Sequence, residues 1–152
     1  MRSFLVLFVT TLLLSSCGPD VVYQENEDFG SGGWPYADSV SFSFPIEDTA
    51  SKYDLVLSVD HTQDFLSQNF YVRLNTHLPD GTVLEQPLSL QLADKFGEWY
   101  GDCDSKNCTV DISIQEGTRF TAPGDYRLVV GQFSRQDPLP EVTGIGFRIV
   151  KR

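Results

Sequence analysis

Basic residues are scarce in this chain. Its 152 residues include 11 Lys and Arg against 21 Asp and Glu, a formal net charge of −10. A balance this acidic argues against nucleic acid binding and against attachment to an anionic membrane through basic side chains. The chain has only two histidines, and it lacks Gly-x-Ser-x-Gly and His-Glu-x-x-His motifs. The sequence therefore predicts no catalytic residues, no resident metal and no cofactor, and we expect the protein not to be an enzyme.

Long apolar runs are limited to one stretch at the N-terminus. Arg2 precedes an apolar segment over 4–14, which Leu-Ser-Ser-Cys at 14–17 completes. The segment has the features of an export signal and is too short to span about 30 Å of hydrocarbon. Its last four residues resemble the lipobox of bacterial lipoproteins, in which the cysteine is acylated and becomes the first mature residue. An ordinary secretory signal with an incidental cysteine is the alternative.

The lipobox defines the expected domain organisation. Residues 1–16 are predicted to be a lipoprotein signal peptide, and Cys17 the lipidation site. Two or more acyl chains would hold the protein at a membrane in the cell envelope. The segment 17–33 has few apolar residues and ends in a Gly-rich stretch. We expect it to be a tether, followed by one folded domain over 34–152.

Two cysteines remain after Cys17 is assigned to lipid. Cys103 and Cys108 lie in a polar stretch and would be oxidised in an exported protein, so we predict a disulfide that contributes about 2 kcal/mol. A metal site is the alternative, but no second Cys pair or His follows at ligand spacing. The nearby Asp102, Asp104 and Asp111 match no calcium-loop spacing.

Apolar and polar residues alternate along most of the chain from Val40 onward, which is typical of half-buried β-strands. Pro-Asp-Gly-Thr at 79–82 is a tight-turn signal, so 70–78 and 83–92 are predicted to form a hairpin. The pattern indicates an all-β fold, an antiparallel β-sandwich of jelly-roll or immunoglobulin-like type with about seven to eight strands. The seven expected strands cover 40–46, 53–59, 70–78, 83–92, 110–114, 126–130 and 145–149.

Aromatic residues in Gly-rich segments are the candidate contact residues for a partner. They are Trp34, Tyr36, Trp99 and Tyr100. Such residues either contact a protein or a sugar ring, or fold back to close the ends of the sandwich. We expect His61 and His77 to be solvated.

Several short motifs follow the lipobox in a fixed order. They are Gly32-Gly33-Trp34, Phe44-Pro45-Ile46, Leu78-Pro79-Asp80-Gly81, Pro123-Gly124-Asp125-Tyr126, Asp137-Pro138-Leu139-Pro140 and Gly144-Ile145-Gly146-Phe147. Their order and spacing resemble the gliding-motility lipoproteins of the GldH family from Bacteroidota, over essentially the whole chain after the signal. The resemblance implies an envelope lipoprotein that works with other gliding proteins, is linked to type IX secretion and has no catalytic residues. The Cys103–Cys108 loop departs from the family pattern, so we assign it no function.

Further features are interpreted through the same resemblance. The Asp-Ser/Thr-apolar triplets around Ser39 and Thr49 resemble O-glycosylation acceptors of exported proteins in that phylum. No acidic run of the kind that directs surface export there follows Cys17, so we expect the domain to face the periplasm. The alternative function is a glycan-binding lipoprotein of a nutrient-uptake system, with Trp34 or Trp99 stacking on a sugar.

Overall fold

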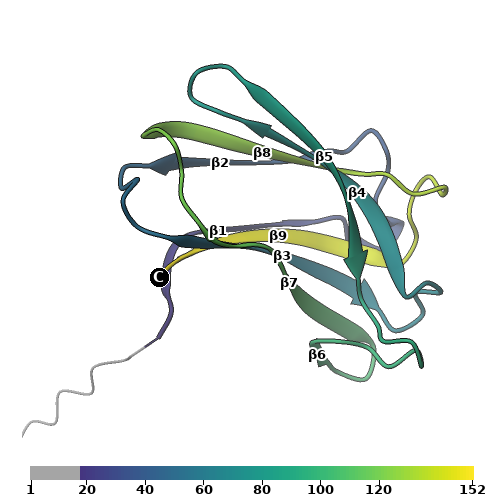
Figure 1. Cartoon of the computed structure of the whole chain (residues 1–152). Coiled ribbons are helices and arrows are strands. Elements are labelled where there is room, and N and C mark those ends of the chain that lie inside the picture. The colour runs from purple at the N-terminus through teal and green to yellow at the C-terminus, as the bar shows by residue number, and fades with distance from the viewer. Residues whose placement is uncertain (1–17) are drawn as a thin grey trace, which may run out of the picture.

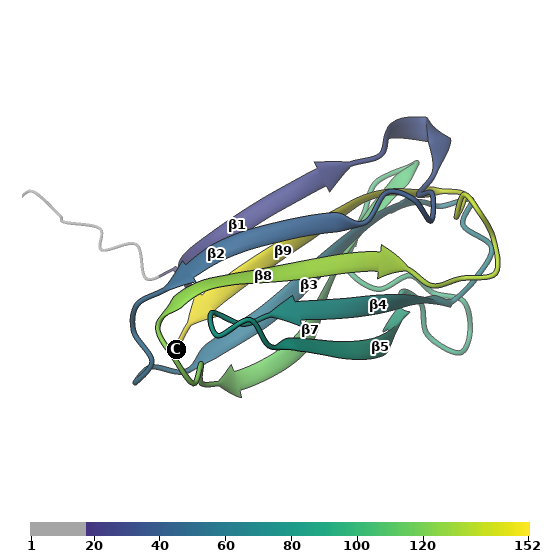
Figure 2. The ribbon, with the colours of Figure 1, turned by 90° about the horizontal axis from the view of Figure 1, so that it is seen from above.

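The computed structural model describes residues 18–152, so the predicted signal peptide and Cys17 lie outside the described residues. Two antiparallel sheets pack face to face (Figure 1), one in the order β1-β9-β3-β7-β6 and the other in the order β2-β8-β4-β5. The strands of both layers run in similar directions (Figure 2), and the predicted antiparallel β-sandwich is confirmed. The elements are β1 Asp20–Asp28, η1 Gly30–Gly32, β2 Val40–Ile46, β3 Tyr53–Thr62, β4 Asn69–His77, β5 Val83–Gln91, β6 Asp102–Cys103, β7 Asn107–Thr118, β8 Gly124–Gln132 and β9 Val142–Lys151.

The alternation of the sequence fills the space between the sheets. In β2 every second side chain is buried and the others are exposed, and β8 follows nearly the same pattern. Phe147 of β9 meets the rings of Phe42 and Phe44 across the layers, with ring centroids 5.6 and 5.5 Å apart. The largest fully buried side chains of the core are Trp34, Phe42, Phe147, Leu57, Leu90, Leu92, Ile145 and Ile149.

The tether predicted over 17–33 is wrong for most of its length. β1 lies within this segment and pairs with β9 from Asp20, opposite Lys151, to Asp28, opposite Gly144. Of the side chains of β1, Tyr23 alone is partly buried, so main-chain pairing rather than side-chain burial holds most of this strand. Edge strands of this kind leave no apolar alternation in the sequence.

The number of strands exceeds the expected seven to eight because β1 and the two-residue β6 add to the predicted set. The predicted hairpin is confirmed as β4 and β5, which pair from Asn69, opposite Gln91, to His77, opposite Val83. Gly81 has φ +86° in its turn, a conformation that favours glycine.

The two ends of the sandwich carry different parts of the chain. Asp20 pairs with Lys151, so the described chain begins and ends at the same end of the molecule (Figure 1), which we call the proximal end. Gly18 and Pro19 alone separate Cys17 from β1. The opposite, distal end carries the β3–β4 and β8–β9 loops. Among residues 18–152, no helix has the length and apolar character needed to cross a bilayer.

Tyr23→Ala tests whether β1 belongs to the folded domain. The Tyr23 ring lies 5.4 Å from that of Phe44 and 6.0 Å from that of Phe147, so its loss should lower the free energy of unfolding by about 2 kcal/mol. Val22→Ala is the matched control, because Val22 is 47% exposed and should cost less than about 0.5 kcal/mol. Urea unfolding followed by tryptophan fluorescence measures both, and equal small effects would show that the segment is a tether.

Candidate functional site

Trp34 fastens the N-terminal segment to the distal end. Its main chain forms an antiparallel bridge with Leu139, with N–H to O distances of 2.9 and 2.8 Å. Its indole Nε1 donates to the carbonyl of Asp38, and its ring stacks on Phe29 at 5.0 Å. The neighbouring Gly33 has φ +75°, and a Cβ there would lie 2.6 Å from the Leu139 oxygen. Trp34 is fully buried and is therefore not an exposed contact residue, which corrects that prediction.

The buried side-chain amide of Gln132 fixes the β8–β9 loop. The Gln132 side chain donates from Nε2 to the carbonyls of Trp34 and Gln136, and its Oε1 accepts from the N–H of Ser134. Tyr36 fixes the outer side of the loop, because its N–H donates to Asp137 Oδ1 at 2.9 Å and its hydroxyl donates to the Ser134 carbonyl. Five hydrogen bonds thus fix a loop that has no strand of its own. Tyr36 nevertheless stays 44% exposed.

A groove of about 900 Å³ opens between the β3–β4 and β8–β9 loops. We call it the distal groove. Among its lining residues, Phe65, Phe70 and Leu139 are buried parts of the core. Others are exposed and apolar: Leu66 is 99% exposed, Tyr71 51% and Phe133 49%. Concave apolar surfaces with exposed aromatic residues are typical of sites that bind a ligand or a protein partner.

Charged and amide groups surround this apolar surface. The Arg73 guanidinium lies 4.3 Å from the centre of the Phe133 ring, a cation–π contact that orients the ring. Phe133 is further fixed by its N–H, which donates to the Tyr71 carbonyl at 2.8 Å. Asn69, Gln136 and Arg135 add hydrogen-bonding groups to the lining. The groove is therefore equipped for contacts that combine aromatic stacking with a few hydrogen bonds.

His61 is fully buried, so the prediction that it is solvated is wrong. The half-buried Trp99 covers it, with ring centroids 4.6 Å apart, and Phe65 lies on another side at 6.0 Å. Nδ1 donates to the Thr62 carbonyl at 2.8 Å, while Nε2 has no hydrogen-bond partner among the described residues. Burial lowers the pKa of His61, so the ring is neutral near pH 7. Trp99 therefore folds back over the core, which agrees with the prediction that such aromatic residues can close the ends of the sandwich.

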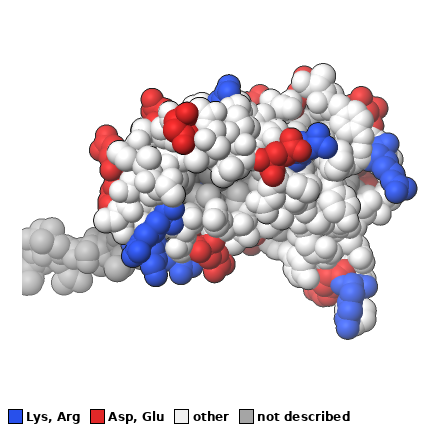
Figure 3. Space-filling model, turned by 45° about the horizontal axis from the view of Figure 1, so that its top comes forward, with Lys and Arg blue, Asp and Glu red and all other residues white. Residues whose placement is uncertain are grey.

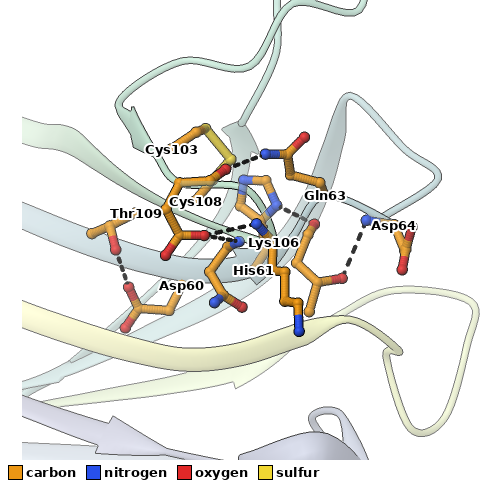
Figure 4. The surroundings of a disulfide bond; sticks show 11 residues. Asp60, His61, Gln63, Asp64, Cys103, Lys106, Cys108 and Thr109 are labelled. Carbon is orange, nitrogen blue, oxygen red and sulfur yellow. Dashed lines mark hydrogen bonds between the residues drawn. A yellow bond between two sulfur atoms is a disulfide. The ribbon is translucent and has the colours of Figure 1, made fainter.

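The disulfide loop packs beside His61 (Figure 4). Cys103 and Cys108 are bonded in the structure, and Cys108 pairs across the sheet with His61. Asp104 accepts the N–H groups of Asn107 and Lys106 at 2.8 and 2.7 Å, and these donors lower the pKa of its carboxyl. Gln63 joins this loop to the β3–β4 loop by donating its side-chain amide to the Asp104 carbonyl. The loop thereby supports one wall of the distal groove.

The remaining predicted residues are spread over the surface. Tyr100 is 46% exposed and follows Trp99. His77 lies on the outer face of β4, where Arg127 Nη2 approaches its Nδ1 at 3.3 Å. Ser39 is exposed just before β2, whereas Thr49 is half-buried in a turn. O-glycosylation at Ser39 and Thr49 stays a prediction.

The acidic residues near the disulfide loop do not converge. Asp111 binds Ser58 of β3 and Arg148 of β9 at 2.5 and 2.8 Å. Asp104 is engaged with its own loop, and Asp102 lies on β6. Within 18–152 no three His, Cys, Asp or Glu residues are grouped so that they could hold a metal.

Sequence reasoning missed the residues that form the distal groove. Leu66 and Phe133 are far apart in the chain and meet only because β4 pairs with β8. One available signal was Tyr71, an aromatic residue on the face of β4 that alternation assigns to solvent. An exposed aromatic residue at such a position indicates a contact surface.

Fold and groove together define an antiparallel β-sandwich domain with a partly apolar groove at one end. The chain belongs to the GldH lipoprotein family, whose model matches residues 21–149. This confirms the resemblance found in the motifs.

Two relatives match nearly end to end. A protein named gliding motility lipoprotein GldH homolog, from Christiangramia forsetii, is 27% identical and covers 99% of this chain and 98% of its own length. Gliding motility lipoprotein GldH of Flavobacterium johnsoniae is 24% identical, with 97% and 95% covered. Among solved structures, the infectious bursal disease virus VP2 subviral particle matches with a TM-score of 0.34 and 14% identity, over 85% of this chain and 30% of that one.

Burial of His61 predicts a loss of stability in mild acid. The pKa of the ring is lowered on folding, so below the unfolded value of about 6.5 the unfolded chain binds a proton that the folded chain resists. Stability should therefore fall between pH 7 and pH 5 by up to about 1.4 kcal/mol per pH unit. Urea unfolding at several pH values measures this slope. His61→Leu should abolish it and His77→Leu should keep it, and a slope that survives in His61→Leu would contradict the assignment.

Proposed function

We propose that this protein is a lipid-anchored, non-enzymatic accessory component of the gliding motility machinery, linked to type IX secretion, and that it binds another envelope protein through the distal groove. The groove is the observation that carries the proposal. It presents Leu66 from the β3–β4 loop, Tyr71 from β4 and Phe133 from the β8–β9 loop, which the buried Gln132 side chain fixes. Rigid aromatic anchors of this kind carry most of the binding energy in protein interfaces. The printed names of the two relatives support the role in gliding.

The position of Cys17 gives this contact surface a direction. With Gly18 and Pro19 alone between the lipidated residue and β1, the proximal end would lie close to the bilayer. The strands run from this end to the distal one, and the ten residues of β9 span about 33 Å. The distal groove would therefore face away from the membrane, into the periplasm.

Cys17→Ala tests the anchor. Without the thiol no acyl chain can be attached, so the variant should appear in the soluble fraction or as an uncut precursor. Fractionation of host cells, with mass spectrometry of the N-terminus, distinguishes these forms. A correctly processed Cys17→Ala protein that stays in the membrane fraction would overturn the lipoprotein assignment.

Leu66→Asp together with Phe133→Asp tests the distal groove. Charges placed in its apolar lining should reduce crosslinked recovery of gliding or secretion components by about thirtyfold, the effect of losing one interface hot spot. Val21→Asp together with Val22→Asp is the matched control, because it adds the same two charges to exposed apolar residues of β1, outside the groove. Equal recovery from the groove variant and the control would exclude the groove as the binding surface.

The alternative function is a glycan-binding lipoprotein. Trp34 cannot stack on a sugar in such a protein, because its side chain is buried. Tyr71 and Phe133, with the amides of Asn69 and Gln136, are the groups in the distal groove that could receive one. Calorimetric titration with glycans identified on an array distinguishes the two functions. Binding that the groove variant abolishes and the double control Val21→Asp with Val22→Asp retains would assign the groove to a sugar.

A further inference from the structure

A second hollow lies between the two sheets on the flank bounded by β5 and β7. We call it the flank cleft, and its volume is about 290 Å³. Leu84 and Leu88 line it from β5, Leu55 and Ile114 line it from the first sheet, and Phe120 follows β7. This volume is at the lower limit for ligand pockets, which begin at about 300 Å³. Aliphatic and aromatic side chains form its apolar lining, which suits a hydrocarbon chain, and polar residues such as Thr76, Gln86 and Gln115 complete it.

The cleft exists because the core is left open along this flank. β5 is the last strand of its sheet, and β6 covers β7 only at Cys108 and Thr109. Among the described residues, nine partly buried hydrophobic side chains pack against the core, and five of them line the cleft: Leu55, Leu78, Leu88, Ile114 and Phe120. The opposite flank, between β1 and β2, is lined by acidic and hydroxyl groups such as Glu25, Glu27 and Ser41. The hollow on that flank is therefore more polar than the flank cleft.

The cleft reaches the proximal end, where basic residues gather. Its lining includes Arg119, which follows β7. Tyr53 pairs with Thr118, which brings Lys52 and Arg119 to adjacent strand ends, and the Arg152 N–H donates to the Lys52 carbonyl at 2.9 Å. Lys and Arg side chains are visible beside the point where the grey N-terminal chain meets the domain (Figure 3).

Their charges are not equally available. Arg152 is paired with Asp54 at 2.7 Å and with Glu116 at 3.6 Å. Within 18–152 neither Arg119 nor Lys52 forms an ion pair. Arg119 lines the cleft and Lys52 precedes the adjacent strand β3. In a protein with a net charge of −10, two cations without ion pairs beside an apolar cleft favour a ligand with an anionic head and an aliphatic chain.

We propose that the flank cleft holds one acyl chain of an anionic membrane lipid, whose head group contacts Arg119 and Lys52. The proposal rests on the anchoring proposed above, since the lipid comes from the bilayer that Cys17 would hold next to the proximal end. An acyl chain in the cleft would remove its apolar side chains from water, which lowers the free energy. A strand added from a partner protein would instead meet Pro87 in β5, which lacks the N–H that continuous pairing requires.

Photocrosslinking in vesicles tests the cleft directly. The full-length lipidated protein is reconstituted into phosphatidylcholine vesicles that contain phosphatidylglycerol with a diazirine in its acyl chain, and crosslinked peptides are mapped by mass spectrometry. Peptides of β5 and of 114–121 should carry most of the label, whereas β1, which also begins at the proximal end, should carry little. Labelling of β1 equal to that of β5 would overturn the proposal, because it would reflect only nearness to the membrane.

Two neighbouring residues of β5 provide matched variants. Leu84 lines the cleft, and the similarly exposed Val83 does not. Leu84→Glu should lower the labelling of β5 and β7 by about tenfold, because an acyl chain in the cleft would cover the new carboxylate and remove it from water, and Val83→Glu should leave it unchanged. Arg119→Glu should remove the preference for the anionic probe over diazirine phosphatidylcholine, whereas Arg135→Glu, at the distal groove, should not. Equal labelling by both probes in the unmodified protein would overturn the head-group assignment.

Flotation of the same vesicles separates this proposal from the one on which it rests. Protein that fails to float would refute the anchor. Protein that floats with the cleft unlabelled would refute the acyl-chain site and leave the anchor standing. Crosslinks from β7 to another protein in intact cells, with the cleft unlabelled in vesicles, would assign the flank to a partner strand and would also overturn the proposal.

Discussion

The structure depends on the pairing of β9 with a neighbour on each side. β9 lies between β1 and β3 and places Phe147 against the aromatic residues of the second sheet. Gly146 lets the Asn26 side chain of β1 lie against β9, because a Cβ there would lie 2.2 Å from Asn26 Oδ1 and would displace that side chain. β1 and β3 therefore both pair with a strand that lies far from them in the sequence. Contacts between such distant parts of a sequence are characteristic of slow-folding β-proteins.

Side-chain alternation predicted the strands that bury one face. The seven expected segments all lie within or overlap observed strands, and the hairpin around Gly81 follows from its turn residues. β1 could not be found in this way, because its side chains are nearly all exposed and its partner is the main chain of β9. β6 has two residues, too few for any period to be visible. Side-chain patterns in a sequence indicate which residues are buried, but they do not indicate main-chain pairing at the edge of a sheet.

The candidate site was less accessible to sequence reasoning, because exposure depends on loops that meet in space. The aromatic residues around Trp34 and Trp99 were recognised as special, but only the fold decides that Trp34 is buried while Tyr36 stays accessible. His61 ends an alternating strand and looks solvated until the loop that carries Trp99 covers it. The exposed Leu66 and Phe133 have ordinary local sequences, and they become a surface only because two loops meet at the distal end.

The short connection between Cys17 and β1 has a mechanical consequence. If the protein is anchored at Cys17 and bound at the distal groove, tension enters at the start of β1 and leaves through the loop that precedes β9. Such tension acts along the two paired strands, so their hydrogen bonds are loaded together in shear instead of being opened one after another. This geometry resists rupture far better than unzipping does. A domain of this kind can transmit force between a membrane and a moving assembly without unfolding.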